Sequence, residues 1–259
     1  ECSKAKALPS YANAFRRLYL NQPTEALSRW LPMDAYEECE ERYTDEQLEG
    51  RTCYAGLDLS STLDLTALVL VFPRTEEEGK GYDVLPYFFI PSENIEQRYR
   101  RDGVPYPSWR DSNFIYCTEG DVIDYGYVKN KIVELGKRYD IKEIAVDRWN
   151  ATQLAIALEN ECGFNVAYYG QGYRSMSAPS KELEASIIGK RFRHNGHPVL
   201  KWNASVCAAE EDPAGNIKPS KKRSNERIDG IVASVMGIGR AIANADTTSV
   251  YEDRGLESI

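Results

Sequence analysis

The sequence from Tyr54 to Phe72, YAGLDLSSTLDLTALVLVF, contains two apolar runs around a polar turn. The runs are Cys53–Leu59 and Leu65–Phe72, and Ser60–Thr62 separates them. The second run consists almost entirely of Leu, Val and Ala, which is typical of a strand covered on both faces. We therefore predict a β-hairpin at the centre of a sheet.

Asp58 is the polar exception near the end of the first run. Burial of an unpaired carboxylate costs several kcal/mol or shifts its pKa, so such a group normally has a cation or a polar cluster beside it. An aspartate at the end of a strand can also cap the turn that follows. Asp58 taken alone fits both interpretations.

The rest of the chain alternates strands and helices. Tyr82–Ile90 is predicted as a third strand, nearer an edge of the sheet because of Pro86. The later predicted elements are a helix at Asp124–Tyr139, a strand at Glu143–Asp147, a helix from Asn150, a strand at Phe164–Tyr168 and a helix at Ser180–Arg193. Residues 91–116 carry no assignable pattern. A meander of strands followed by alternating helices and strands indicates an α/β sheet of mixed direction, flanked by helices.

The first fifty residues are predicted to be a lead-in segment without a core of its own. Short helices are expected at Tyr11–Leu20, Leu27–Leu31 and Met33–Glu41. The segment is expected to pack on the main domain or on another part of a larger assembly.

Asp147 ends its predicted strand just as Asp58 does. Ligands of open α/β sheets usually bind at the carboxyl ends of the strands. If the two strands are parallel neighbours, the two carboxylates meet at one edge and need a cation to remain ionised. Asp147 alone could instead pair with Arg148 or cap the next helix.

Asp229 lies near the start of an apolar helix, SNERIDGIVASVMGIGRAIA, for which Ser224 or Asn225 is the expected cap. Small side chains form a stripe along this helix, at Gly230, Ser234, Gly237 and Ala241. The stripe would allow the helix to approach the sheet closely and bring Asp229 to the strand ends. Alternatively, Asp229 only favours the helix dipole.

Three such carboxylates suit Mg²⁺, which prefers oxygen ligands. Two divalent ions, about 3.5–4 Å apart, can activate a water and stabilise the leaving oxygen in phosphodiester hydrolysis. No histidine is required, and we interpret His194 and His197 as surface residues.

The charge of the chain is −8, but most of the imbalance is local. Residues 34–49 hold eight acids and one base, and the remainder, with 32 acids and 31 bases, is nearly neutral. Bulk charge therefore neither supports nor excludes DNA as a partner. The six cysteines form no C-x-x-C pair, and no apolar run reaches the length of a membrane span. We expect reduced thiols and a soluble, intracellular protein without a membrane partner.

Four blocks together resemble a known family: GLDLSSTLDLTAL, EIAVDRWN, KELEASIIGKRFRHNGHPVLKW and EDPAGNIKPSKKRSNERIDGIVA. In this order they are similar to the C-terminal nuclease domain of the large terminase subunit of tailed double-stranded DNA bacteriophages. The likeness extends from about Phe15 to Ala243. It implies a ribonuclease-H-like fold, two Mg²⁺ or Mn²⁺ ions, and catalytic, metal-ligating roles for Asp58, Asp147 and Asp229. Asp64 is an auxiliary candidate, although capping of the turn explains it equally well.

The chain departs from full-length large terminases in one respect. It contains no G-x-x-x-x-G-K-[ST] phosphate-binding loop, so no ATPase site is expected. We predict a lead-in at 1–50 from a missing ATPase domain, a nuclease domain at 51–245 and a flexible tail at 246–259.

A basic segment precedes Asp229 within the loop Pro213–Arg227. Its bases are Lys218, Lys221, Lys222, Arg223 and Arg227. Charge runs are usually solvated surface, but this one could hold DNA phosphates beside the metals. Gly215 and Pro219 indicate a turn at its tip.

The expected function is metal-dependent cleavage of concatemeric viral double-stranded DNA during genome packaging, in the cytoplasm of the host cell. The resemblance implies the small subunit, the portal protein and the ATPase domain of the same subunit as further partners. The alternative is a docking module that links the motor to the portal, the small subunit or DNA.

Overall fold

The computed structural model describes residues 29–59, 65–93, 95–147, 152–224 and 227–252, with the single residues Cys2, Phe15 and Tyr19. In this part of the chain seven strands form one mixed sheet in the order β4-β3-β2-β1-β5-β6, and β7 also pairs with β3. The strands are β1 (Thr52–Asp58), β2 (Thr66–Arg74), β3 (Gly81–Pro91), β4 (Tyr116–Thr118), β5 (Asp140–Asp147), β6 (Val166–Tyr169) and β7 (Phe192–His194). A separate antiparallel hairpin consists of β8 (Ala209–Glu211) and β9 (Ile217–Pro219).

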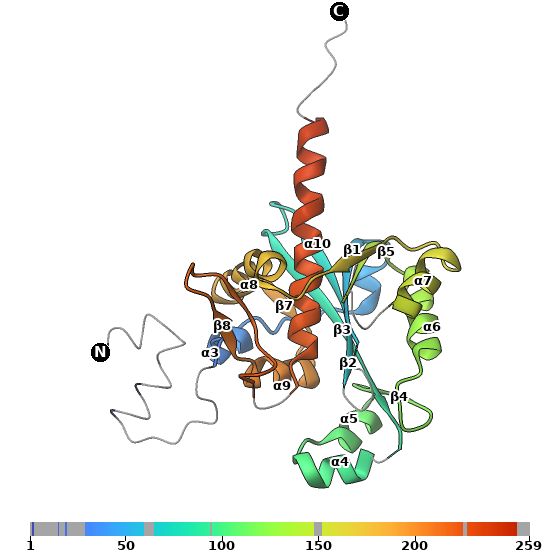
Figure 1. Ribbon diagram of the computed structural model, residues 1–259. Helices are drawn as coiled ribbons and strands as arrows, with labels where there is room; N and C mark the ends of the chain where they lie inside the picture. The colour runs from blue at the N-terminus through green and yellow to red at the C-terminus, as the bar shows by residue number, and fades with distance from the viewer. Residues whose placement is uncertain are drawn as a thin grey trace, which may run out of the picture.

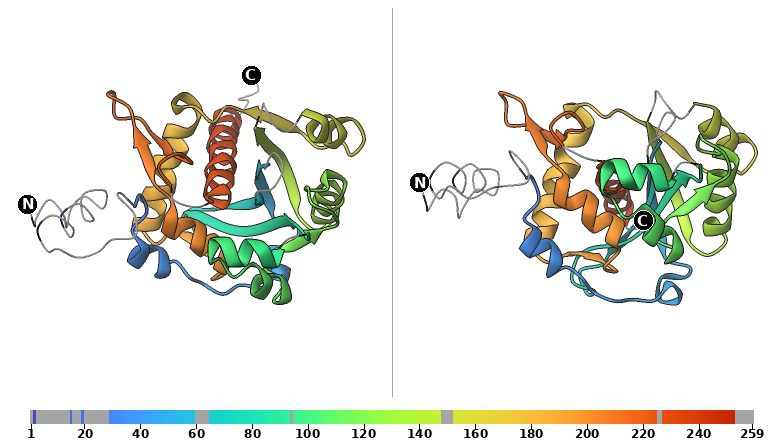
Figure 2. Two further views of the ribbon diagram at one scale, coloured as in Figure 1. Left: turned by 60° about the horizontal axis from the view of Figure 1, so that its bottom comes forward. Right: turned by 90° about the horizontal axis from the view of Figure 1, so that it is seen from below.

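Helices cover both faces of the sheet. They are α3 (Met33–Glu37), the 3-10 helix η1 (Asp45–Leu48), α4 (Ile95–Asp102), α5 (Tyr106–Asp111), α6 (Tyr125–Gly136), α7 (Thr152–Asn160), α8 (Tyr173–Ile188), α9 (Pro198–Val206) and α10 (Asp229–Glu252). Figure 1 shows α10 crossing one face together with α8 and α9, while α6 and α7 cover the other. In both views of Figure 2, α4 and α5 lie beside α9. No helix of the described chain is long and apolar enough to cross a membrane.

The central hairpin is confirmed. β1 and β2 are antiparallel, with Ala55 opposite Leu70, and β5 runs parallel to β1 on its other side. β2 lies between β1 and β3 and is fully buried over most of its length, as its continuous apolar sequence predicts. The predicted meander followed by parallel strands is therefore the observed architecture.

Alternation along the strands produces two hydrophobic cores. Val69, Val71 and Ala145 face α10, whereas Leu68 and Leu70 face the opposite layer around α6. Each such side chain is fully buried, and burial of a Val or Leu stabilises the fold by about 1.5–3 kcal/mol.

The prediction that β3 lies nearer an edge than the central hairpin is confirmed, since among the described strands only the short strands β4 and β7 lie outside it. β3 pairs with β2 along its length, and on its other side with β7 at Tyr82–Val84 and β4 at Phe89–Pro91. Pro86 lies between these two contacts, where β3 has a strand on one side only. Its missing N–H group is tolerated there.

The helix predicted at Ser180–Arg193 begins earlier and ends earlier, as α8, with Pro179 inside it. Pro179 has no N–H group to donate to the carbonyl of Ser175. The hydroxyl of Tyr169 donates to that carbonyl instead, at 2.7 Å. The replaced hydrogen bond explains why a proline does not end this helix. The residues after α8 form β7 rather than more helix.

The lead-in from Arg29 onward packs on the sheet domain. Trp30, Leu31 and Tyr36 are buried in the core on the α10 side. Residues 29–31 are not helical, contrary to the prediction for Leu27–Leu31, because the Trp30 amide donates to the carbonyl of Cys207 rather than within a helical turn. The predicted helix at Tyr11–Leu20 lies almost entirely outside the described residues.

The interpretation of His194 as a surface residue is wrong. Its ring is buried, stacks on Tyr36 at 4.1 Å between centroids, and contacts the Tyr36 carbonyl through Nε2 at 2.8 Å. His197 lies against Phe88 and Phe114. Desolvation lowers the pKa of both histidines, so both are neutral at pH 7.

Bases of the sheet domain neutralise the acidic segment at 34–49. The ion pairs are Glu37–Lys201 at 2.8 Å, Glu38–Lys190 at 2.5 Å, Glu41–Arg193 at 2.7 Å, Asp45–Arg138 at 3.3 Å and Glu49–Arg138 at 3.1 Å. The acidic side chains of this segment therefore pair with basic side chains of the sheet domain itself. All six cysteines are free thiols.

Candidate active site

Asp58 and Asp147 end two adjacent parallel strands. Leu57 of β1 pairs with Val146 of β5, so the two aspartates occupy the next positions in register. They lie on the same face as Ala145, beneath α10, because neighbours in register point the same way. Asp58 is 1% exposed and Asp147 8%, which makes both buried carboxyl groups.

Helix α10 carries the third aspartate to the same edge. The close approach of this helix to β1 depends on two glycines that face each other, Gly56 and Gly237. A Cβ on Gly56 would lie 1.9 Å from the carbonyl oxygen of Ala233. A Cβ on Gly237 would lie 3.3 Å from the carbonyl oxygen of Tyr54. The predicted role of small residues in helix–sheet approach is therefore confirmed. Asp229, the first residue of α10, is 3% exposed.

Asn203 of α9 holds the start of α10. Its Oδ1 accepts a hydrogen bond from the Gly230 amide at 2.7 Å, and its Nδ2 donates to the Arg227 carbonyl at 3.0 Å. The predicted cap Ser224 has another role: its hydroxyl accepts from the Ala208 amide and donates to the Ser220 carbonyl. The cap therefore comes from a different helix, and Asn225 lies outside the described residues.

A single ammonium group joins two of the three carboxylates. Nζ of Lys221 lies 2.8 Å from Oδ2 of Asp58 and 2.8 Å from Oδ1 of Asp229. Nε2 of Gln171 donates to the other oxygen of Asp58 at 2.9 Å. The polar-cluster interpretation of Asp58 is therefore correct.

The charges in this cluster are coupled. Burial raises the pKa of Asp229, Lys221 opposes this rise and the nearby Asp58 adds to it, which gives a net pKa of about 7. Burial alone would lower the pKa of Lys221, but the two carboxylates raise it above its usual value. The Lys221 ammonium therefore stays charged, while the carboxyl group of Asp229 retains its proton up to about neutral pH.

This donor set fits a hard divalent cation. Oδ2 of Asp229 is buried and accepts no hydrogen bond from the described residues. The side chain of Lys221 is half exposed, so it can leave the position between the two acids. Within the described chain, no three His, Cys, Asp or Glu side chains are grouped closely enough to hold a metal together. Two acids share the ammonium, and Asp147 lies beside them on the neighbouring strand.

The basic segment divides into paired and exposed groups. Lys218 pairs with Glu210 at 2.8 Å and lies over the ring of Tyr173, and Arg227 pairs with Asp102 at 3.4 Å. Lys222 and Arg223 are exposed. The segment is also not a simple loop, because it begins with the turn of the β8–β9 hairpin at 213–215 and continues as β9. Gly215 lies in this turn as predicted, but Pro219 lies in β9 and pairs with Ala209.

Two polar residues of the site were missed from the sequence. Asn203 occupies a position on the apolar stripe of α9, between Leu200 and Ala204, and this was a usable signal for a buried polar role. Gln171 follows β6 in a short connection and carried no such signal. Asp64, Arg148 and Asn150 lie outside the described residues.

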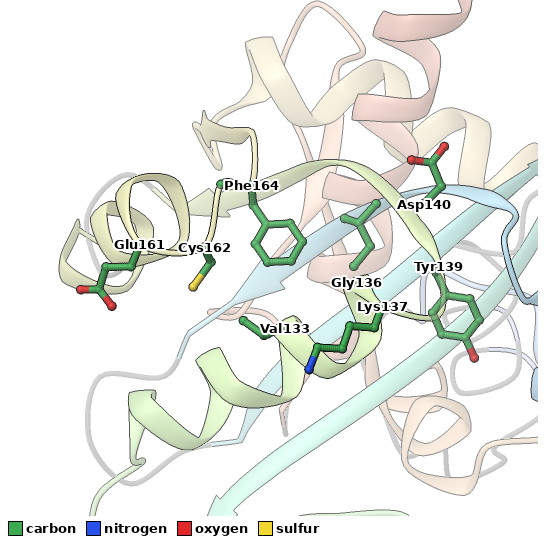
Figure 3. A pocket seen from close by; sticks show the side chains of 10 residues that line it. Val133, Gly136, Lys137, Tyr139, Asp140, Glu161, Cys162 and Phe164 are labelled. Carbon is green, nitrogen blue, oxygen red and sulfur yellow. The ribbon is translucent and has the colours of Figure 1, made fainter.

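A hollow at the opposite end of the sheet is separate from this site. Cys162 and Phe164 after α7, and Tyr139 and Asp140 at the start of β5, line it (Figure 3). It lies at the amino ends of β5 and β6, whereas Asp58 and Asp147 are at carboxyl ends. The carboxylate cluster is therefore the better candidate for chemistry on an open α/β sheet.

This strand order, with helices on both faces of the mixed sheet, defines a ribonuclease-H-like fold. The chain belongs to the family of the terminase large subunit, endonuclease domain, whose family model matches residues 2–245.

Curated relatives match most of the chain. The terminase large subunit of Enterobacteria phage HK97 is 35% identical over 246 residues, which are 93% of this chain and 47% of that protein. The protein YmfN of Escherichia coli K12 is 31% identical over 99% of this chain and 58% of its own length. The chain thus spans about half the length of the curated relatives it matches.

Solved structures agree with the fold. The crystal structure of the HK97 bacteriophage large terminase has a TM-score of 0.75 at 34% identity, covering 92% of this chain and 49% of that one. The large terminase nuclease from thermophilic phage G20c, crystallised with bound magnesium, has a TM-score of 0.52 at 10% identity, covering 84% and 99%. The second likeness concerns the fold alone.

Proposed function

We propose that this chain is the nuclease part of a phage packaging motor and cuts concatemeric viral double-stranded DNA in a metal-dependent reaction. One observation supports this most strongly: two buried carboxylates, Asp58 and Asp229, converge on a single cation position at the carboxyl edge of the sheet. Family membership favours an endonuclease over the docking-module alternative.

Asp58, Asp147 and Asp229 would hold Mg²⁺ or Mn²⁺, with two ions as the full complement. Such ions supply an activated water and stabilise the leaving oxygen of a phosphodiester. Gln171 orients Asp58 by its hydrogen bond to Oδ1. Asp64, in the segment between β1 and β2, is assigned an auxiliary role.

The basic segment would place the duplex on these acids. Lys222 and Arg223 are exposed, so they would be able to contact phosphates. Lys218 and Arg227 border the same region. Lys221 neutralises the acids in the metal-free protein. It can turn to a DNA phosphate when divalent cations replace its charge.

The greater length of the relatives suggests the organisation of the whole subunit. Residues 1–50 would lead in from an ATPase domain, 51–245 would form the nuclease, and 246–259 a flexible tail. The small subunit, the portal protein and that ATPase domain would be its partners, in the cytoplasm of the host cell.

Plasmid cleavage tests the proposal. Supercoiled plasmid with Mn²⁺ or Mg²⁺ should become nicked, then linear, then smeared, and EDTA should stop the reaction. The smear is expected because no recognition helix or zinc finger occurs in the sequence. Discrete bands would show that the chain reads sequence by itself, and an intact plasmid at high protein concentration would support the docking module.

Three substitutions assign the roles. Asp58→Asn, Asp147→Asn and Asp229→Asn should each abolish cleavage and retain duplex binding, because each removes one charge that holds a cation. Asp140→Asn is the matched control, since Asp140 lies at the amino end of the same strand as Asp147. Asp64→Asn should reduce cleavage less than the three. Normal cleavage by any of the three variants would remove that residue from the site.

A further inference from the structure

We propose that helix α4 forms a second DNA-binding surface beside the carboxylate cluster, with Arg100 and Arg101 contacting the phosphates of the duplex. This inference rests on the proposed function, because duplex DNA is taken as the substrate. It assigns a role to the segment 91–116, which showed no pattern in the sequence.

The topology places α4 at the end of the sheet that carries the carboxylate cluster. β1 and β3 are both antiparallel to β2, so they run in the same direction. The carboxyl end of β3 therefore lies at the same edge as Asp58. Helix α4 begins four residues after β3 ends, so it extends from the edge that carries the acids.

An ion pair joins α4 directly to the start of α10. Nη1 of Arg227 lies 3.4 Å from Oδ2 of Asp102, the last residue of α4. Arg227 is only two residues before Asp229, so their Cα atoms are at most about 7.6 Å apart. The end of α4 and the carboxylate cluster are therefore neighbours across one ion pair.

Asp102 is surrounded by arginines. Arg101 donates to it through Nη2 at 2.9 Å. This hydrogen bond lowers the pKa of Asp102, against the effect of burial, and Arg227 and Arg98 lower it further. Asp102 therefore stays ionised and keeps basic groups from two distant segments together.

The two segments carry an excess of positive charge. Residues 95–102 and 221–227 contain seven bases and three acids. Arg100 is exposed and forms no ion pair within the described residues, and Lys222 and Arg223 share this property on the other segment. Duplex DNA presents one phosphate charge per about 1.7 Å of its axis, so a duplex on the acids brings further phosphates to neighbouring surfaces.

The surface is rigidly held. Tyr106 of α5 is buried and meets Trp202 of α9 edge-on at 6.2 Å, and Trp109 packs on Trp202 at 5.5 Å. The same helix α9 carries Asn203, which caps α10. Because α4 packs against α5 and α5 packs against α9, α9 supports the arginines of α4 as well as the carboxylate of Asp229. Arginine binds phosphate through a preformed planar guanidinium group. Packing that holds the arginine helix in place therefore favours phosphate binding.

The test measures duplex binding without divalent cations over a range of salt. The Arg100→Ala/Arg101→Ala variant should reduce the slope of log affinity against log salt by about two units, because each of the two arginines neutralises one phosphate. Arg100→Glu is the second variant, because Arg100 can be changed without disturbing Asp102. Lys80→Ala/Lys137→Ala is the control, since both lysines are exposed at the opposite end of the sheet.

The outcomes separate this inference from the proposed function. Reduced slopes for both arginine variants, with a wild-type slope for the control, would support the surface. Wild-type slopes for the arginine variants in a protein that still cuts plasmid would overturn the surface and leave the nuclease intact. If the wild-type chain neither binds nor cuts duplex DNA, both proposals fail.

Discussion

Nζ of Lys221 lies 2.8 Å from Oδ1 of Asp229, and the same atom holds Asp58 at an equal distance. A residue expected to contact DNA is therefore the counter-charge of the acids themselves. A divalent cation bound to these acids, as proposed above, would compete with the lysine for one position, and that competition can be measured.

Lys221→Met should destabilise the metal-free protein by about 1–3 kcal/mol at pH 8, because two buried carboxylates lose their cation. This loss of stability is smaller than the loss expected for a fully buried ion pair, because the lysine side chain is half exposed. Mn²⁺ should raise the melting temperature of the variant more than that of the wild type. Lys222→Met, one residue along and exposed, is the matched control and should change neither quantity. Equal Mn²⁺ shifts in all three proteins would show that the ammonium does not occupy the cation position.

Asp229→Asn should change the pH dependence of stability. The native pKa of Asp229 is raised from 3.8 to about 7, so the folded state binds more protons than the unfolded state between these values. Stability from this group is present at low pH and is lost as the pH rises from about 4 to 7, by at most about 1.4 kcal/mol per pH unit. Without metal, the variant should gain stability over the wild type above pH 7 and none below pH 4. Chemical denaturation across this range measures the difference, and a pH-independent difference would contradict it.

Asn203→Leu should separate positioning from stability. Loss of its bonds to Gly230 and Arg227 should cost about 1–2 kcal/mol, as for other helix caps. Cleavage should fall further than the folded fraction does, because Asp229 begins the released turn. Ser205→Ala on the same helix loses only a bond to the Trp202 carbonyl and serves as the control. Full activity in folded Asn203→Leu protein would show that this cap does not position the carboxylate.

Gly56→Ala should destabilise the protein by at least about 1–3 kcal/mol, because the new methyl group would lie 1.9 Å from the Ala233 carbonyl oxygen. The helix must move away from β1, and Asp229 moves with it. Cleavage should therefore fall even at temperatures where the variant is folded. Gly172→Ala is the control, since a Cβ there meets nothing within 4 Å. Equal melting temperatures for the two variants would contradict the tight helix–strand contact.

The predictable parts of the fold were those in which one physical effect dominates. The continuous apolar run Leu65–Phe72 indicated a strand buried on both faces, and the small residues of α10 indicated close packing on the sheet. The start of α8 was missed because Pro179 normally ends a helix, and no local pattern reveals that Tyr169 replaces its hydrogen bond. The burial of His194 depends on Tyr36, 158 residues away in sequence. Likewise, the sequence indicated three acids at strand and helix ends, but not the position of Lys221 between two of them.

The hydrogen bond from Trp30 to Cys207 has a mechanical consequence. The carbonyl of Cys207 lies between α9 and the β8–β9 hairpin. The lead-in therefore joins the domain just before the hairpin that leads into the basic segment. Tension applied to the chain ahead of residue 29 would be borne first by this bond and by the buried side chains of Trp30 and Leu31. The sheet would carry load only after that anchor had yielded, which shields the register of β1 and β5 from pulling at the amino-terminal side.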